Sequence, residues 1–213
     1  MKAFIFDMDG TIVDNMPFHH MARILLLNKY GVTLSREETQ LLREGSFSSM
    51  IKQYIGHQVS DDEINALNME KQLIYRMLYK KHIKEIQGLR QLLHESKKWG
   101  YSIALSTMGS SDNIDFVLSH LKVQHFFDTI VNGEQVKKGK PHPDIYYAAL
   151  TSLNLASKNA VVFEDSHSGV LAALQAGLDV VGICTTYSKD EFKAWGVKHS
   201  IQSYDEYLEK YFN

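Results

Sequence analysis

Residues 4–11 read Phe4-Ile5-Phe6-Asp7-Met8-Asp9-Gly10-Thr11, a short apolar run that ends in two carboxylates two positions apart. An apolar run of this length is typical of a strand that is buried on both faces of a parallel sheet. In open α/β sheets, ligands bind beyond the carboxyl ends of the strands, and Asp7 and Asp9 would lie there. Burying two acids is costly unless a cation compensates them. The alternative interpretation is a strand followed by an ordinary Asp-Gly turn.

Four further apolar runs follow along the chain, with helix-length segments between them. The expected strands are Ala3–Phe6, Ser102–Leu105, Thr129–Val131, Ala160–Phe163 and Val180–Ile183. The expected helices of this part are Gln87–Trp99, Asp112–Leu121, Pro143–Leu153 and Ser168–Ala176. Because strand and helix alternate, the sequence predicts an α/β fold with a Rossmann-like, doubly wound parallel sheet.

The region from Asp14 to about His82 breaks this alternation, because it shows helical patterns and no convincing strand. The expected helices are 18–30, 36–43, one that begins near residue 48, and 61–82. Ser60 and Glu63 form a capping-box pattern at the start of the last of them. The sequence therefore predicts an all-helical cap subdomain, residues 14–83, inserted into an α/β core of residues 1–13 and 84–213.

The composition excludes several classes of function. The chain has 213 residues, of which 44% are hydrophobic and 23% charged, with a formal net charge of −2, as is usual for a globular protein. With no basic run, it has no electrostatic footprint for nucleic acid or an anionic membrane. The one cysteine, Cys184, excludes an intrachain disulfide, and no run approaches the roughly 18 apolar residues that cross a bilayer. We expect a cytoplasmic protein that binds neither nucleic acid nor a membrane.

A second acidic motif follows the expected strand Ala160–Phe163, in the stretch Val161-Val162-Phe163-Glu164-Asp165-Ser166. Hard cations such as Mg²⁺ take oxygen ligands, so carboxylates from separate strand ends suffice to bind one. The sequence therefore predicts one metal site built from Asp7, Asp9, Glu164 and Asp165. A capping role of Glu164 and Asp165 for the following helix is the alternative, and the two roles are compatible.

Two loops carry the features of an anion site. The strand Ser102–Leu105 runs into hydroxyl side chains, Ser106 and Thr107, and then Met108 and Gly109 precede a helix, whose amide groups attract anions. Lys140 lies between Gly139 and Pro141, and the prolines 141 and 143 stiffen its backbone for phosphate binding. The alternatives are ordinary helix-capping hydroxyls and a solvated lysine loop that also contains Lys137 and Lys138.

These elements occur in the order Asp-x-Asp, Thr, Lys, Glu-Asp. The stretches Phe-Asp-Met-Asp-Gly-Thr at 6–11, Lys-Pro-x-Pro-Asp at 140–144 and Phe-Glu-Asp-Ser-x-x-Gly-Val-x-Ala-Ala at 163–173 make the chain similar to the haloacid dehalogenase superfamily. The likeness is to its phosphatase and β-phosphoglucomutase-like branch, whose members carry a helical cap. It implies a Mg²⁺-dependent phosphatase that hydrolyses a small phosphorylated metabolite, foremost a sugar phosphate.

The resemblance also implies a role for each motif residue. Asp7 would attack phosphorus to form an aspartyl-phosphate, and Asp9 would act as acid and then as base. The Asp7 carboxylate, the Asp9 carbonyl, Glu164 and Asp165 would hold Mg²⁺. Thr107, Met108, Gly109 and Lys140 would bind the phosphoryl group. In the cap, His19 (with its neighbour His20 as a competitor) and Lys71 would contact the substrate, unless they are a solvent-facing histidine and a helix-surface lysine.

One departure from the mutase pattern favours hydrolysis. The mutases carry a phosphate-gripping arginine shortly after a cap glycine, whereas Gly45-Ser46-Phe47-Ser48 places serine there and Arg43 lies on the other side of Gly45. A β-phosphoglucomutase-type phosphomutase is therefore the second hypothesis, inorganic pyrophosphatase activity a third. A non-catalytic phosphate-binding protein is the hypothesis from a different class. We expect a monomer or a weak homodimer.

Overall fold

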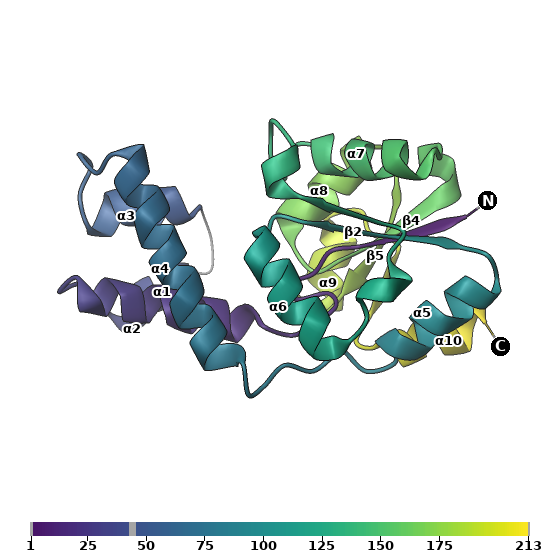
Figure 1. Ribbon diagram of the computed structural model, residues 1–213, viewed down its shortest axis with the longest axis horizontal. Coiled ribbons are helices and arrows are strands. Elements are labelled where there is room, and N and C mark those ends of the chain that lie inside the picture. The colour runs from purple at the N-terminus through teal and green to yellow at the C-terminus, as the bar shows by residue number, and fades with distance from the viewer. Residues whose placement is uncertain (1, 43–45, 213) are drawn as a thin grey trace. The chain divides into compact units, whose positions relative to one another are not determined.

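The computed structural model describes residues 2–42 and 46–212, which divide into two compact units (Figure 1). One unit comprises the chain up to Asp14 and from Ile83 onward, and the other is Asn15–His82. Arg43 and Gly45, which entered the comparison with the mutases, lie outside the described residues.

The larger unit is built on a six-stranded sheet in which every neighbouring pair is parallel. Its strands are β1 (Ala3–Phe6), β2 (Ser102–Thr107), β3 (Thr129–Asn132), β4 (Ala160–Glu164), β5 (Asp179–Ile183) and β6 (His199–Ile201). The order across the sheet is β3-β2-β1-β4-β5-β6. The predicted α/β fold with a doubly wound parallel sheet is confirmed, and β6 is an addition to the five expected strands.

Helices cover both faces of this sheet (Figure 1). They are α5 (Leu89–Lys98), α6 (Ser111–Leu121), α7 (Asp144–Leu153), α8 (His167–Gln175), α9 (Lys189–Ala194) and α10 (Tyr204–Tyr211), with short 3₁₀ turns at Gln124–Phe126, Gly133–Gln135 and Ser157–Asn159. Successive side chains of β1 point to opposite faces of the sheet. Ala3 and Ile5 pack in the core cluster that also contains Ala172 and Ala173 of α8. Phe4 and Phe6 point to the other face, where Phe6 stacks on Phe163 at 4.8 Å between ring centroids.

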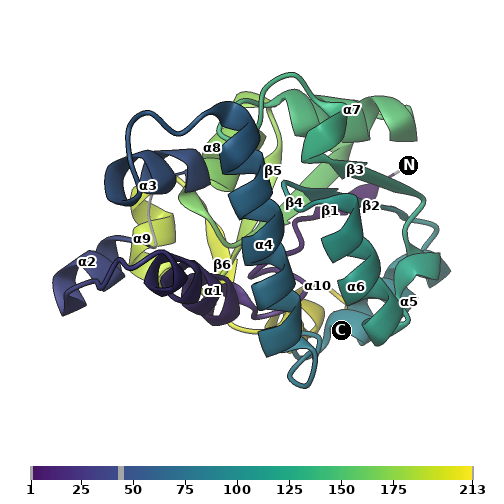
Figure 2. The same cartoon turned by 60° about the vertical axis from the view of Figure 1, so that its left-hand side comes forward.

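The smaller unit consists of four helices, α1 (Met16–Lys29), α2 (Arg36–Leu41), α3 (Phe47–Tyr54) and α4 (Asp61–Tyr79). The predicted capping box is confirmed, because Ser60 N donates to Glu63 Oε2 at 2.8 Å and Glu63 N to Ser60 Oγ at 3.3 Å. Helices α1 and α4 lie side by side (Figure 2). The prediction that the last helix reaches His82 is wrong: α4 ends at Tyr79, and the His82 amide closes a turn onto the Tyr79 carbonyl.

The segments that connect the larger unit to the insertion are paired with each other. Val13 and Glu85 form an antiparallel bridge, and Ile86 N donates to the Ile12 carbonyl at 2.9 Å. Among the helices of residues 2–42 and 46–212, none combines the length and apolar character that crossing a membrane requires.

Candidate active site

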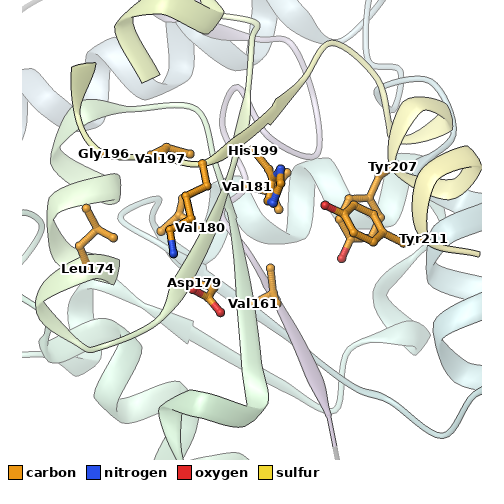
Figure 3. Close-up of a pocket in the computed structure, with 11 residues that line it drawn as sticks. Val161, Leu174, Asp179, Val180, Val181, Gly196, Val197, His199, Tyr207 and Tyr211 are labelled. Carbon is orange, nitrogen blue, oxygen red and sulfur yellow. The ribbon is translucent and has the colours of Figure 1, made fainter. Parts of the chain in front are cut away.

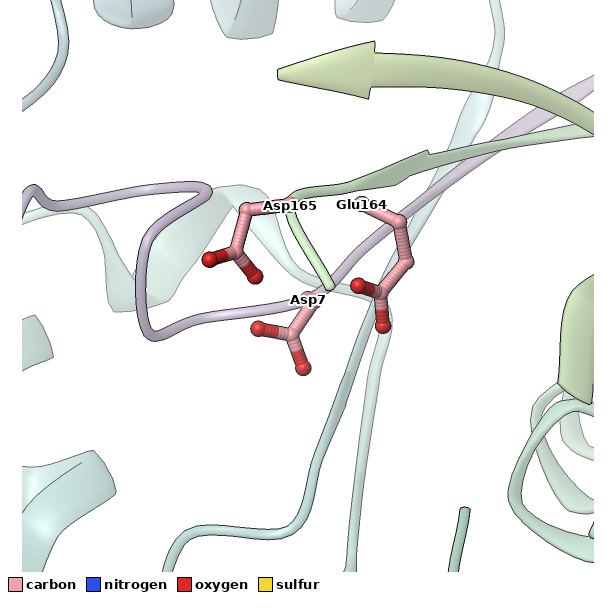
Figure 4. Close-up of side chains that lie close together, drawn as sticks. All are labelled: Asp7, Glu164 and Asp165. Atoms are coloured by element: carbon pink, nitrogen blue, oxygen red, sulfur yellow. The ribbon is translucent and has the colours of Figure 1, made fainter. Parts of the chain in front are cut away.

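Predicted polar residues of the larger unit gather at the point where the strand order of the sheet reverses. From β1 the chain builds the sheet first toward β2 and β3 and then, on the other side, toward β4 and β5. Asp7 directly follows β1, Asp165 directly follows β4, and Thr107 is the last residue of β2. This switch point is where doubly wound sheets bind their ligands. Oxygens of Asp7, Glu164 and Asp165 lie within 4.8 Å of one another (Figure 4).

Lys140 is the cation of this cluster. Its ammonium lies 2.6 Å from Asp7 Oδ1 and 2.5 Å from Glu164 Oε1, and it also donates to the Ser106 carbonyl at 3.2 Å. The side chain is only 5% exposed. Burial by itself would lower the pKa of Lys140, but the negative charges of Asp7 and Glu164 together raise that pKa well above its usual value. Lys140 therefore stays charged, as its predicted role requires.

Glu164 is fully buried, and both of its carboxylate oxygens accept hydrogen bonds. Besides Lys140, Oε1 accepts from the Tyr146 hydroxyl at 2.9 Å, and Oε2 accepts from Ser166 N and Oγ, each at 3.0 Å. Gly169 leaves the space that this carboxylate fills, since a Cβ there would collide with it. Glu164 is thus held in one orientation, in which it binds the Lys140 ammonium.

Asp165 is held on the other side of the cluster. The Thr186 hydroxyl donates to Asp165 Oδ2 at 2.5 Å, and burial raises the pKa of Asp165 well above its ordinary value. Gly10 adopts φ +76°, and a Cβ on Gly10 would collide with the Asp165 carboxylate. Glycine is thus needed at this position for both the turn and the close approach.

Asp7 combines burial with proximity to other acids. Burial raises the pKa of Asp7 to about 8; the charge of Lys140 opposes this shift, and the charges of Glu164 and Asp9 add to it. The three buried carboxylates of the cluster thus share one ammonium, an excess of negative charge that a divalent cation would neutralise. Hard carboxylate oxygens in this setting fit Mg²⁺.

The Asp9 carboxylate lies outside this three-carboxylate group and points toward the loop after β2. A Cβ on Gly109 would lie 3.7 Å from Asp9 Oδ2 and 3.3 Å from Thr107 Oγ1. Gly109 N donates to Thr107 Oγ1 at 3.0 Å. The structure therefore brings Asp9, Thr107 and Gly109 together.

Met108 links this loop to the lysine loop. A Cβ on Gly133 or Gly139 would lie 2.7 Å or 2.5 Å from Met108 Cε, so both glycines make room for the methionine side chain. Gly139 immediately precedes Lys140. The side chain of Met108 thus packs next to the residue that carries the cation.

Within the helical unit, His19 and Lys71 form a buried pair. Lys71 Nζ lies 2.8 Å from His19 Nδ1, and the His19 ring stacks on Tyr75 at 3.7 Å between centroids. The residues are only 8% and 5% exposed. The alternative that they are a solvent-facing histidine and a helix-surface lysine is therefore wrong, because both side chains are buried. The competitor His20 is half-buried.

A separate cavity of about 430 Å³ lies near the amino-terminal ends of β4, β5 and β6, where these strands begin (Figure 3). Its lining includes Val161, Val181, His199 and Tyr207. It lies away from the carboxyl ends of the strands and contains none of the predicted site residues.

Tyr146 and Thr186 belong to the site but were not predicted from the sequence. Tyr146 follows the Lys-Pro-x-Pro-Asp motif by two positions, so helical proximity to that motif was an available signal. Thr186 follows β5, and no local pattern relates it to Asp165, 21 positions earlier in the chain.

Comparison with known proteins gives consistent matches. Residues 4–183 match the family described as haloacid dehalogenase-like hydrolase. A phosphorylated carbohydrates phosphatase of Thermotoga maritima is 32% identical over 94% of this chain and 87% of its own length. A β-phosphoglucomutase of Bacillus subtilis is 30% identical over 86% of this chain and 83% of its own. The crystal structure of a family IA, variant 3 hydrolase from Entamoeba histolytica superposes with a TM-score of 0.90 at 29% identity, covering 97% and 95% of the two chains.

Proposed function

Since the chain belongs to the haloacid dehalogenase-like hydrolases and is a phosphoric monoester hydrolase, we propose that it is a Mg²⁺-dependent phosphatase of a small sugar phosphate that works through an aspartyl-phosphate on Asp7. The observation that supports this most is the ion pair of Lys140 with Asp7, 2.6 Å long, at the switch point of the sheet. A buried carboxylate beside a buried ammonium suits attack on an anionic phosphoryl group.

In the first step, Asp7 attacks phosphorus in line with the ester oxygen. The bond from the Asp7 oxygen to phosphorus forms while the bond from phosphorus to the ester oxygen breaks. Asp9 gives its proton to the departing oxygen, so the sugar leaves as a neutral alcohol. Lys140, Thr107 and the amides near Met108 and Gly109 offset the charge on the phosphoryl oxygens.

In the second step, water attacks the phosphorus of the aspartyl-phosphate. The Asp9 carboxylate takes a proton from this water, and the bond between phosphorus and the Asp7 oxygen breaks. Inorganic phosphate leaves, and both aspartates return to their starting states.

The carboxylates of Asp7 and Asp165, with the Asp9 carbonyl, would hold Mg²⁺. Glu164, which the sequence also predicts as a ligand, would instead hold Lys140 in place, because both of its carboxylate oxygens already accept hydrogen bonds. When bound, the metal supplies positive charge that allows an anionic nucleophile to meet an anionic phosphoryl group. Thr186 fixes the orientation of Asp165 through its hydroxyl.

A phosphomutase is the second candidate, because a β-phosphoglucomutase is among the relatives of comparable identity. The residues after Gly45 count against it, since Ser46 and Ser48 stand near the place where the mutases carry arginine. A serine hydroxyl does not replace a bidentate guanidinium in holding a second phosphate.

The function is tested by ³¹P NMR of the purified protein with Mg²⁺ and a mixture of sugar phosphates, polyol phosphates, nucleotides and pyrophosphate. We expect free phosphate to appear while one or more sugar phosphate signals disappear. A new ester signal without free phosphate would identify a mutase. Loss of pyrophosphate alone would identify a pyrophosphatase, and an unchanged spectrum with bound ligand would indicate a binding protein.

Substitution of Thr186 by valine is expected to weaken the response to Mg²⁺. Loss of the hydroxyl that orients Asp165 should raise the half-saturating Mg²⁺ concentration by about tenfold, the size of effect typical of residues that orient metal ligands. A titration of phosphate release against Mg²⁺ measures this. Thr186→Ser keeps the hydroxyl and should behave like the wild type. Equal Mg²⁺ responses of Thr186→Val and the wild type would show that Thr186 does not orient a metal ligand.

A further inference from the structure

Helix α4 carries an exposed apolar row on its outer side. Met69, Leu73 and Met77 recur every four residues and are 71%, 55% and 81% exposed. The buried residues of the same helix, including Ile64, Leu67, Lys71 and Tyr75, lie on the opposite side. Exposed apolar side chains that line up in this way on a soluble domain mark an interaction surface.

Charges of opposite sign stand at the two ends of this row. Spacings of three and four residues continue it to Ala66 and Asp62 at one end and to Lys80 at the other, all of them exposed. The first turn of α4 is acidic at Asp61, Asp62 and Glu63. Two copies paired in parallel would set like charges against each other, whereas an antiparallel pair sets each acidic end against a basic end.

We propose that this row, Met69-Leu73-Met77, is the interface of a homodimer in which two α4 helices pack antiparallel across a twofold axis at Leu73. Met69 then faces the partner's Met77, and the apolar stem of Lys80 lies over the small side chain of the partner's Ala66, so that its ammonium reaches the acidic first turn of the partner's helix. A twofold interface uses the same patch on both subunits, and this row is self-complementary in that sense. Methionine side chains adapt readily to such packing.

The flank of the row is compatible with this pairing. Glu70 lies beside the row, and its carboxylate is occupied by Lys29 and Tyr30 of the same subunit. These contacts hold the Glu70 carboxylate away from the row, against which the partner's methionine would pack. Because only three large apolar side chains per subunit form the row, we expect a dissociation constant of the dimer on the order of micromolar.

The first test is sedimentation of the full chain over a range of concentrations. We expect a dimer that dissociates on dilution, and Leu73→Glu should raise the dissociation constant at least about tenfold, because the dimer would bury two carboxylates against apolar side chains. Met21→Glu changes an exposed methionine of α1 outside the row and should leave the dimer intact. Circular dichroism verifies that both variants keep their helix content.

The second test fixes the geometry. With Cys184 replaced by serine, Leu73→Cys should form a disulfide-linked dimer under mild oxidation, since residues on the twofold axis come within disulfide range. Gln53→Cys, at an exposed position on α3, serves as the control and should not cross-link. A wild type that stays monomeric at every concentration, a dimer that Leu73→Glu leaves intact, or equal cross-linking of both cysteine variants would overturn the proposal.

Discussion

Asp7→Asn is expected to reduce turnover by at least about 10⁴-fold, because the amide that replaces the carboxylate cannot attack phosphorus. The side chains have the same shape, so the packing around Lys140 is retained. Burial raises the pKa of the Asp7 carboxyl to about 8, so replacing this carboxyl with a neutral amide lowers the electrostatic cost of folding. Steady-state phosphate release and unfolding by urea would measure the two effects separately.

Acid quenching followed by mass measurement tests the intermediate directly. Wild-type protein mixed with substrate should gain the mass of one phosphoryl group, and Asp7→Asn should gain none. Asp179→Asn is the matched control, because Asp179 is exposed at the start of β5, at the other edge of the sheet. Full turnover by Asp7→Asn would exclude Asp7 as the nucleophile.

Lys140→Met is expected to lower kcat/KM by about 10²- to 10³-fold, the usual cost of removing a group that stabilises the transition state. It also leaves Asp7 and Glu164 buried without their cation. Breaking a buried ion pair from one side costs about 3–5 kcal/mol, and protonation of Asp7, whose pKa burial already raises, would recover part of this. We therefore expect a lower free energy of unfolding together with the loss of activity.

The same loop supplies the controls for Lys140. Lys137 and Lys138 are exposed, so Lys137→Met and Lys138→Met remove the same charge without touching the buried cluster. Both should retain wild-type kinetics and stability. If all three variants lost activity equally, the loop would act through its overall charge rather than through the contacts of Lys140.

The sequence was sufficient to predict the central strands, because their apolar runs record burial on both faces. In the run Phe4–Phe6, Ile5 packs in the core on one face of the sheet, whereas Phe4 and Phe6 pack against Phe163 on the other. Strand β6 was not predicted, since its three residues, His199–Ile201, lie at the sheet edge and only Ile201 is buried. An edge strand of this kind leaves no apolar run in the sequence.

The site was predictable only as far as its residues follow strands or carry motifs. Asp7, Thr107 and Asp165 follow from strand ends, whereas the Thr186 hydroxyl meets Asp165 through the arrangement of β4 and β5. The sequence also treats Glu164 and Asp165 as equivalent neighbours. Their different partners depend on the two faces of β4, which point Glu164 toward Tyr146 and Lys140.

The pairing of Val13 with Glu85, described above, bears on how this chain can diversify. Both ends of the insertion are fastened to each other within the larger unit, by that bridge and by the bond from Ile86 to Ile12. The larger unit therefore holds the two ends of the insertion together, whatever the length or sequence of residues 15–82. Recombination or design could therefore exchange the helical insert as a cassette without changing the paired segments that close the larger unit.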